Sequence, residues 1–387
     1  MNRRILFAAA ALAALPLAAH AAEPFRIGLL VPMTGPFQST GRAINDAVKL
    51  YIKQHGDTVA GHKVEILLRD DAGVPDNTKR LATELVVRDH VNAFAGFGLT
   101  PLALATAPVA TQAKIPEIVM VAATSSIVNA SPYIFRSGQV LPQPATIAAD
   151  WALKHGIKKI VSVVSDYGPG YDAEKWFNDR FTAGGGTVVA ALRVPLANPD
   201  FAPFLQRVKD AAPDAMYAFV PAGVGGIFAK QFVERGMDKS GIRFIATGDV
   251  TDDDNLGDMG DAMLGVVTAG PYSAAHPSAL NKSFVDGYRE ISGGHRAGFV
   301  AAFAYDGIEM LYRALEKTKG NMDGTALAEA LKGLSFESPR GQISIDPETR
   351  EIITPIYIRE VKKVDGALYN VEAETFAAVK DPAKAKP

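Results

Sequence analysis

The sequence predicts an α/β protein built from two similar lobes, each with a parallel-type sheet flanked by helices. Short apolar runs of strand length alternate with longer amphipathic runs, and parallel strands require such helical crossovers. The alternation restarts near residue 159, in register with the first half. A chain of 387 residues with 48% hydrophobic residues also suits two folded domains.

In the first half, apolar runs predict four strands, at Arg26–Val31, Val64–Leu68, Asn92–Gly96 and Ile118–Val121. Amphipathic runs with apolar residues at the three- and four-residue spacing of one helix face predict three helices, at Ala43–Gln54, Asn77–Arg88 and Pro101–Gln112. We expect Asp76 to cap the second of these helices. We expect Thr100 to cap the third, with Pro101 in its first turn.

The second half repeats this alternation. Strands are expected at Lys159–Val164, Val188–Leu192, Met216–Val220 and Phe244–Thr247, and helices at Ala173–Thr182, Phe201–Asp210 and Ile227–Arg235. Three features recur at a constant offset of 124 residues: GHKVEILL from Gly61 and GGTVVAAL from Gly185, the turns at Val74 and Asn198, and the strands from Asn92 and Met216. An equal offset across strand, turn and helix predicts two lobes of one topology, although any two βαβ units share a general likeness.

The last third of the chain predicts elements that both lobes must share. Helices are expected at Ala279–Ser292, Ala301–Thr318 and Thr325–Lys332, and strands at Val266–Thr268, Ile343–Ile345, Ile352–Val361 and Leu368–Val371. The chain would then cross between the lobes three times and form a hinge, near Tyr133–Gln139, Ala269–Ser273 and Ile343–Ile353. We expect residues 24–138 and 272–345 in lobe 1, and residues 139–271 and 346–380 in lobe 2.

Residues 1–21 have the three-part pattern of a secretory signal peptide. Two arginines precede the apolar run Ile5–Ala19, and small residues lead to an expected cleavage site after Ala21. The apolar run is short for a membrane span, and no later segment has eighteen uninterrupted apolar residues. We therefore expect an exported protein without direct membrane insertion.

Composition and motifs exclude several functions. The absence of cysteine removes disulfides, thiolate metal sites and thiol nucleophiles, and 40 basic against 42 acidic residues create no positive field for nucleic acid. HExxH, GxxxxGK[ST], GxSxG and a GxGxxG after the first strand are all missing. We expect no enzymatic activity, no cofactor and no metal, with a secreted hydrolase as a weaker alternative.

The acidic run Asp252–Asp254 begins like a calcium-binding loop. Leu256 stands at a ligand position, however, and Met263 stands where the bidentate acid belongs. We expect these aspartates to be solvated or to cap a helix.

The remaining signal lies in the loops after the strands, where open α/β sheets bind ligands. Thr40, Thr100 and Thr124 place hydroxyls in three such loops of the first half, with Ala122 and Ala123 just before the last of them. A hydroxyl at a helix start suits a carboxylate, although simple capping also explains a Thr-Pro pair.

Two residues stand out in the loops of the second half. Tyr167 could close over a ligand or pack between the lobes. Asp249 follows an apolar strand, where a buried acid needs a cation or a hydrogen-bond donor, although it could cap the next helix instead.

Together these segments resemble the periplasmic solute-binding proteins of branched-chain amino acid ABC transporters, such as the leucine/isoleucine/valine-binding protein. The likeness covers essentially the whole chain after the signal peptide, in the segments MTGPFQSTG, AATSS, SDYGPGYDAE, TGDVTDDD and ESPRGQISIDPETR. It implies a type I periplasmic binding fold with a three-stranded hinge. It also implies a monomer that closes on a small carboxylate ligand in the periplasm and presents it to an inner-membrane permease.

The resemblance also implies roles for single residues. Thr100 matches a carboxylate-binding hydroxyl, and Ala122 and Thr124 match the segment that holds both the carboxylate and the ammonium group. Tyr167 matches an aromatic ring that folds over the ligand, and Asp249 an acid that faces the ammonium group.

Two departures from the family pattern leave the ligand open. Asp249 is shorter than the usual glutamate, and Pro221-Ala222 stand where amino acid binders carry a tyrosine. Both changes enlarge the cavity, whose side-chain pocket Thr40 would line. A hydrophobic or branched-chain amino acid is the first expectation. The alternative is an aromatic carboxylate such as a benzoate derivative, with Asp249 accepting a hydrogen bond from a ring hydroxyl or an amide. A ligand-binding sensor is a weaker alternative.

Overall fold

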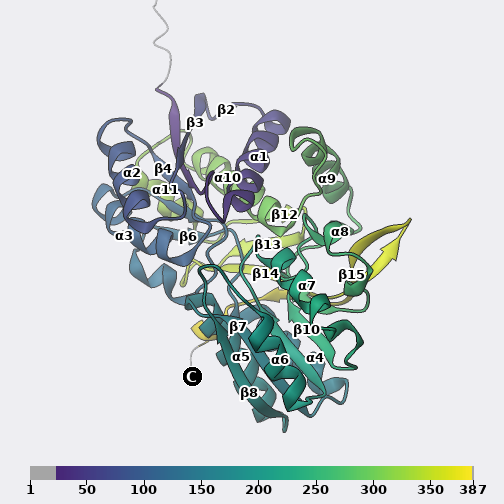
Figure 1. Cartoon of the computed structure of the whole chain (residues 1–387). Coiled ribbons are helices and arrows are strands. Elements are labelled where there is room, and N and C mark those ends of the chain that lie inside the picture. Colours follow the sequence, from purple (N-terminus) through teal and green to yellow (C-terminus); the bar gives the residue numbers. More distant parts are fainter. Residues whose placement is uncertain (1–22, 386–387) are drawn as a thin grey trace, which may run out of the picture.

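The structure is a computed structural model that describes residues 23–385, so the expected signal peptide lies outside the described residues. Figure 1 shows two bodies, with the purple and blue elements in one and the teal elements in the other. A six-stranded sheet has the order β2-β3-β1-β4-β5-β6, and a nine-stranded sheet has the order β12-β13-β14-β11-β10-β9-β7-β8, with β15 beside β14. The predicted two-lobed α/β class is confirmed.

The first lobe is built around the six-stranded sheet. Its strands are β1 (Phe25–Val31), β2 (Thr58–Val59), β3 (His62–Asp70), β4 (Ala93–Gly96), β5 (Glu117–Val119) and β6 (Ile134–Arg136). Its early helices are α1 (Gln38–His55), α2 (Pro75–Val87) and α3 (Thr100–Ala113). The strands from β3 to β6 pair in parallel, whereas β2 pairs antiparallel with β3. Helices α2 and α3 bury one face of the sheet, and α1 buries the other.

The second lobe repeats this arrangement. Its strands are β7 (Lys159–Ser165), β8 (Thr187–Val194), β9 (Ala215–Phe219), β10 (Arg243–Thr247) and β11 (Val267–Gly270). Its helices are α4 (Pro142–Lys154), α5 (Gly168–Ala183), α6 (Ala202–Ala211), α7 (Gly225–Glu234) and the short α8 (Leu256–Met259). The order β8-β7-β9-β10-β11 repeats β3-β1-β4-β5-β6, and β3 and β8 end at Asp70 and Val194, the offset found in the sequence. The shared topology of the two lobes is therefore confirmed.

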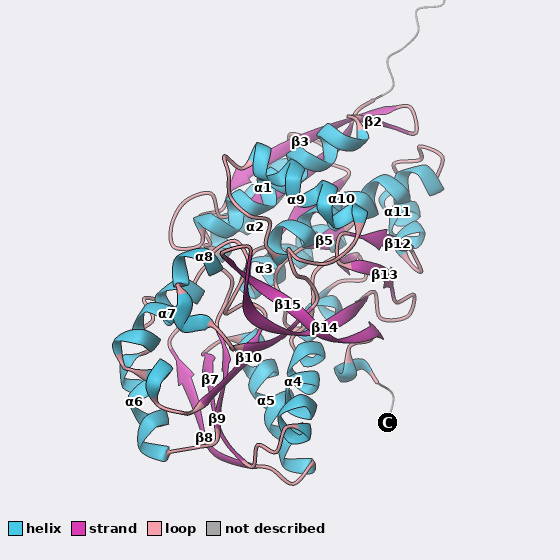
Figure 2. Cartoon of the chain, turned by 90° about the vertical axis from the view of Figure 1, so that its right-hand side faces the viewer, coloured by secondary structure: helices cyan, strands magenta, loops and turns pink. Residues whose placement is uncertain are grey.

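The C-terminal elements serve both lobes. They are α9 (Ala279–Ile291), α10 (Phe299–Lys317), α11 (Gly324–Leu331), β12 (Ser335–Ser338), β13 (Gly341–Ile345), β14 (Ile352–Val364) and β15 (Ala367–Val379). Helices α9, α10 and α11 join the core of the first lobe. Strand β14 starts in that core with Ile352 and continues into the second core with Ile356 and Ile358. Figure 2 shows β14 and β15 passing between the two bodies.

The chain passes between the two cores at three places, as expected for a hinge. It leaves the first lobe after β6, returns between Ala269 and Tyr272, and crosses again along β14. The lobe boundaries given above stay a prediction. No helix among residues 23–385 is both long and apolar enough to cross a membrane.

Several local expectations were wrong. Helix α2 begins at Pro75, so Asp76 lies in its first turn and Val74 is the cap residue. Helix α3 begins at Thr100 itself after Leu99, and the Thr100 side chain caps nothing. The sequence pattern does not reveal α4, because two prolines open it and its buried face consists largely of alanines.

The acidic run after β10 is also buried rather than solvated. Asp252 and Asp253 are 5% and 2% exposed. Asp252 accepts a hydrogen bond from the backbone N–H of Phe299 at the start of α10 (3.1 Å), and Asp253 accepts one from the N–H of Ala274 (3.1 Å). The expectation of a helix-capping role therefore fits Asp252, whereas the expectation that these two aspartates are exposed to solvent is wrong. Residues 23–385 contain no group of three or more acidic or histidine side chains arranged to hold a metal ion.

Candidate ligand-binding site

Loops at the carboxyl ends of strands from both sheets meet between the lobes. A Cβ atom placed on Gly168, at the start of α5, would lie 2.5 Å from Oγ1 of Thr124 in the first lobe. A Cβ atom on Gly223, after β9, would lie 2.8 Å from Oγ of Ser39. The lobes are therefore closed on one another, and we call the region between these loops the interlobe site.

Two threonine hydroxyls form one wall of the interlobe site. Oγ1 of Thr100, at the start of α3, lies 2.8 Å from Oγ1 of Thr124, which follows β5, and both residues are buried. One hydroxyl donates to the other, so the accepting hydroxyl keeps its own hydrogen for a third group. The pair can therefore offer a hydrogen bond to a ligand oxygen, next to the first N–H groups of a helix.

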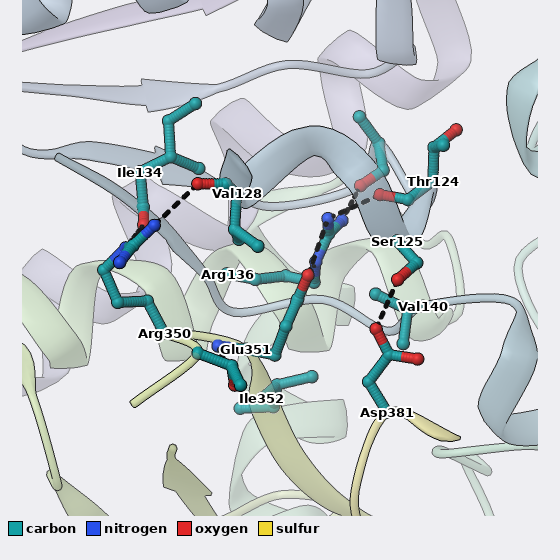
Figure 3. A network of polar contacts seen from close by, with 12 residues as sticks. Thr124, Ser125, Val128, Ile134, Arg136, Val140, Arg350, Glu351, Ile352 and Asp381 are labelled. Carbon is teal, nitrogen blue, oxygen red and sulfur yellow. Dashed lines mark hydrogen bonds and ion pairs between the residues drawn. The ribbon is translucent and has the colours of Figure 1, made fainter. Parts of the chain in front are cut away.

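The backbone around Thr124 is held from behind by a buried ion pair. Nε of Arg136, on β6, lies 2.6 Å from Oε2 of Glu351, and both side chains are inaccessible to solvent. The Arg136 guanidinium also donates to the carbonyl oxygens of Ala122 and Thr124. Figure 3 shows this network under the loop. It fixes the loop geometry, because the guanidinium fork satisfies several acceptors at once.

The other first-lobe residues named from the sequence lie nearby, with different surroundings. Ala123 packs with the core of the second lobe, and its carbonyl accepts a hydrogen bond from the N–H of Leu141 (3.1 Å). Thr40, in α1, is buried, with its methyl group against Gly98 and its hydroxyl toward Gly223. Thr40 therefore lies where α1 meets a second-lobe loop.

Tyr167 lies between the lobes. It is the residue before α5, and its ring stacks on Phe219 at a centroid distance of 6.0 Å and an angle of 21°. It packs against hydrophobic cores of both lobes. Burial, and then the nearby Asp249 carboxylate, raise the pKa of Tyr167, so the phenol stays neutral. The ring thus packs the lobe interface and also borders the interlobe site.

Asp249 contributes to the interlobe site from the second lobe, close enough to Tyr167 to raise the pKa of that phenol, and we call this side of the site the opposite wall. It follows β10, is 6% exposed and accepts a hydrogen bond from Nε2 of Gln139 (3.2 Å). Burial raises the pKa of Asp249 to about 6. Because Asn255 is the cap residue of α8, Asp249 does not cap the next helix.

Further polar atoms near Asp249 have no hydrogen-bond partner among the described residues. Two of them are Oε1 of Gln139 and the hydroxyl of Tyr217, whose pKa is raised by burial and then by Asp249. A buried polar group without a partner costs about 1–3 kcal/mol, so these atoms are suited to a polar group of a ligand. Sequence reasoning missed both residues. Gln139 lies in an expected crossing, and Tyr217 sits inside an apolar strand that gives no functional signal.

Comparisons with known proteins agree with this architecture. The model of a family described as periplasmic binding protein matches residues 24–367. The chain is 42% identical over 384 residues to the Leu/Ile/Val-binding protein homolog 6 of Brucella melitensis, covering 98% of each chain. It resembles the structure of an ABC transporter solute-binding protein from Rhodopseudomonas palustris BisB5 in complex with 3,4-dihydroxybenzoic acid. That similarity has 63% identity and a TM-score of 0.92, over 94% of this chain and 99% of the other. A second ABC transporter solute-binding protein, from Rhodopseudomonas palustris HaA2 in complex with p-hydroxybenzoic acid, is 40% identical to this chain with a TM-score of 0.90, over 94% of this chain and 100% of the other.

Proposed function

The chain belongs to the periplasmic binding protein family, and on that premise we propose that it is the substrate-binding component of an ABC importer whose ligand is a hydroxylated benzoate. The family consists of solute-binding proteins, not of a class of enzymes, and it is periplasmic. The protein itself has no catalytic activity, loses residues 1–21 on export, acts as a monomer and delivers its ligand to an inner-membrane permease. Its site comprises Thr40, Thr100, Ala122, Ala123, Thr124, Tyr167 and Asp249.

The observation that carries this proposal is the chemical difference between the two walls of the interlobe site. The Thr100–Thr124 hydroxyl pair offers a donor, which suits a carboxylate. The Asp249 wall offers a buried acceptor beside the unpartnered atoms of Gln139 and Tyr217. A rigid ring with a carboxylate on one side and a hydroxyl on the other satisfies both walls. The likeness to a dihydroxybenzoate-binding protein supports the same ligand class.

A hydrophobic amino acid is the second candidate ligand. Asp249 could face its ammonium group, and the Brucella relative is named for leucine, isoleucine and valine. The ammonium group would bring a second charge into the desolvated surroundings that raise the pKa of Asp249, and burying that charge costs free energy. A ring hydroxyl can donate to a carboxylate without bringing a charge of its own, which is why we favour it.

A thermal-shift and calorimetry panel tests the ligand class. The protein is unfolded and refolded to remove any carried-over ligand, and is then mixed with 3,4-dihydroxybenzoate, 4-hydroxybenzoate, benzoate, leucine or phenylalanine. We expect the largest increase in melting temperature with the two hydroxybenzoates. Their Kd should be about 1 μM, which corresponds to a binding free energy of about −8 kcal/mol. An increase in melting temperature with leucine alone would mean that the ligand is an amino acid and not an aromatic carboxylate. Turnover of any bound compound would contradict the transport function.

Removing one hydroxyl of the threonine pair tests the carboxylate wall. Thr100→Val keeps the side-chain volume and removes a hydroxyl that lies 2.8 Å from that of Thr124. We expect Kd to rise about tenfold for every carboxylate that binds, because each loses one charge-assisted hydrogen bond. Isothermal titration calorimetry measures the change in Kd. Thr83→Val, at an exposed position of α2, is the matched control. Unchanged affinity would remove Thr100 from the site.

Asp249→Asn tests the opposite wall. We expect this change to weaken 4-hydroxybenzoate about tenfold and to leave benzoate nearly unchanged, since only the former donates a hydroxyl hydrogen to the acid. In the wild-type protein, 4-hydroxybenzoate should bind more tightly as pH rises through about 6, because Asp249 becomes an ionised acceptor there. Calorimetry between about pH 5 and 7 checks both effects. Equal losses for the two ligands would argue against a ring hydroxyl at Asp249.

A further inference from the structure

Ser125 is held by two carboxylates at once. It begins the 3-10 helix η1 (Ser125–Ala130) directly after Thr124. Its backbone N–H donates to Oδ2 of Asp172 (2.8 Å), and its hydroxyl donates to Oδ2 of Asp381 (2.5 Å). Ser125 and Asp381 are 6% and 4% exposed, so water competes little for these hydrogen bonds.

The two carboxylates approach Ser125 from the side of the second lobe. Asp172 lies near the start of α5, which packs in the second core, and α5 begins at Gly168 against Thr124. Asp381 follows β15 and precedes the 3-10 helix η4 (Pro382–Lys384), which packs against α4 of the second lobe. Ser125 itself follows β5 of the first lobe. Both hydrogen bonds therefore join the two lobes, and Figure 3 shows the one from Ser125 to Asp381.

Positive groups offset part of the repulsion between the two aspartates. Burial raises the pKa of Asp172 and the nearby Asp381 adds to this, whereas the N–H of Ser125, the Arg136 guanidinium and the Lys384 ammonium act in the opposite direction. Lys384 also donates to Oδ1 of Asn129, on η1 (2.9 Å). The end of the chain is thus tied to η1 at two positions. Separating the lobes would expose two carboxylates that share one serine as their donor.

We propose that Asp172 and Asp381 form a latch on Ser125 that holds the lobes closed around the ligand and slows its release. This inference rests on the proposed function, because Ser125 is covalently joined to Thr124, whose hydroxyl belongs to the proposed carboxylate wall. The two aspartates are positioning residues that act through the loop and do not touch the ligand. Opening of the lobes breaks both hydrogen bonds in addition to the contacts of the ligand.

A double-mutant cycle with kinetic readout tests the latch. Ser125→Ala and Asp381→Ala each remove the side-chain hydrogen bond, and we expect each to increase the dissociation rate of 3,4-dihydroxybenzoate about tenfold in stopped-flow measurements. The double variant should be no faster than either single variant, because both remove the same bond. Asp323→Ala is the matched control. Asp323 accepts a backbone N–H at the start of α11 (2.9 Å), as Asp381 does at η4 (2.9 Å), so this change removes a similar cap without touching Ser125.

A direct measurement of closure separates failure of the latch from failure of the ligand assignment. The chain has no cysteine, so Val87→Cys and Val189→Cys place two fluorophores on exposed positions of the two lobes. We expect Ser125→Ala to increase the distance between the labels in the ligand-free protein. If the wild type binds no panel compound, the proposed ligand is wrong and the label distance alone decides the latch. Unchanged label distances, or unchanged dissociation rates in a protein that binds, overturn the latch even if the variants lower the melting temperature.

Discussion

Arg136→Met is expected to lower the free energy of unfolding by about 3–5 kcal/mol. Arg136 and Glu351 form an ion pair at 2.6 Å with both side chains fully buried, so the substitution leaves the Glu351 charge without a partner. It also removes the donor to the carbonyl oxygens of Ala122 and Thr124. Urea unfolding monitored by circular dichroism measures the loss, provided that the denaturant slope stays constant.

Two further variants separate the loss of a partner from the loss of the pair. In Arg136→Met/Glu351→Leu an apolar contact replaces the pair, and we expect part of the stability to return, because the buried charge is removed but the carbonyl oxygens of Ala122 and Thr124 still lack the guanidinium donor. Lys175→Met is the surface control, because Lys175 forms a solvent-exposed ion pair with Asp179. We expect this substitution to change the free energy of unfolding by no more than about 0.5 kcal/mol. If Arg136→Met cost no more than Lys175→Met, the buried pair would contribute little to stability.

Most of the fold could be predicted from the sequence because its elements carry their own periodic signal. Lys159–Val164 is an apolar run bounded by polar residues, and it forms most of β7. Strand β15 shows where this fails. Only Leu368–Val371 is expected from the sequence, but the strand extends to Val379 through a partly exposed segment. Its length depends on pairing with β14, which is a tertiary contact that no local pattern records.

The candidate site could be predicted in part for a related reason. Parallel strands bring their carboxyl ends to one edge, so reading the strand ends was enough to select Thr100, Thr124 and Asp249. The supporting residues are paired over long separations. Arg136 and Glu351 are 215 residues apart, and Ser125 and Asp381 are 256 apart. No spacing rule links such partners, and only the folded arrangement of the hinge and the C-terminal segment brings them together.

Glu117 offers the second large effect, through the dependence of stability on pH. It lies on β5 between Phe94 of β4 and Ile134 of β6, is fully buried, and neither carboxyl oxygen has a hydrogen-bond partner among the described residues. Burial raises the pKa of Glu117 well above its ordinary value of 4.5. Above that value the unfolded chain releases a proton that the folded chain retains. The stability contributed by Glu117 is therefore fully present below pH 4.5 and is lost as pH rises through the folded pKa, by about 1.4 kcal/mol per pH unit.

Glu117→Leu should remove this loss. We expect the variant to be more stable than the wild type at pH 7, and the difference to shrink as pH falls toward 4.5, because a buried leucine neither titrates nor needs a hydrogen-bond partner. Urea unfolding at half-unit pH steps compares the two proteins, with Glu337→Leu on the exposed face of β12 as the control that keeps the wild-type pH profile. A variant less stable than the wild type at pH 7, or a stability difference independent of pH, would mean that Glu117 is ionised and paired in the folded protein. The buried acid would then stabilise the first lobe instead of weakening it at neutral pH.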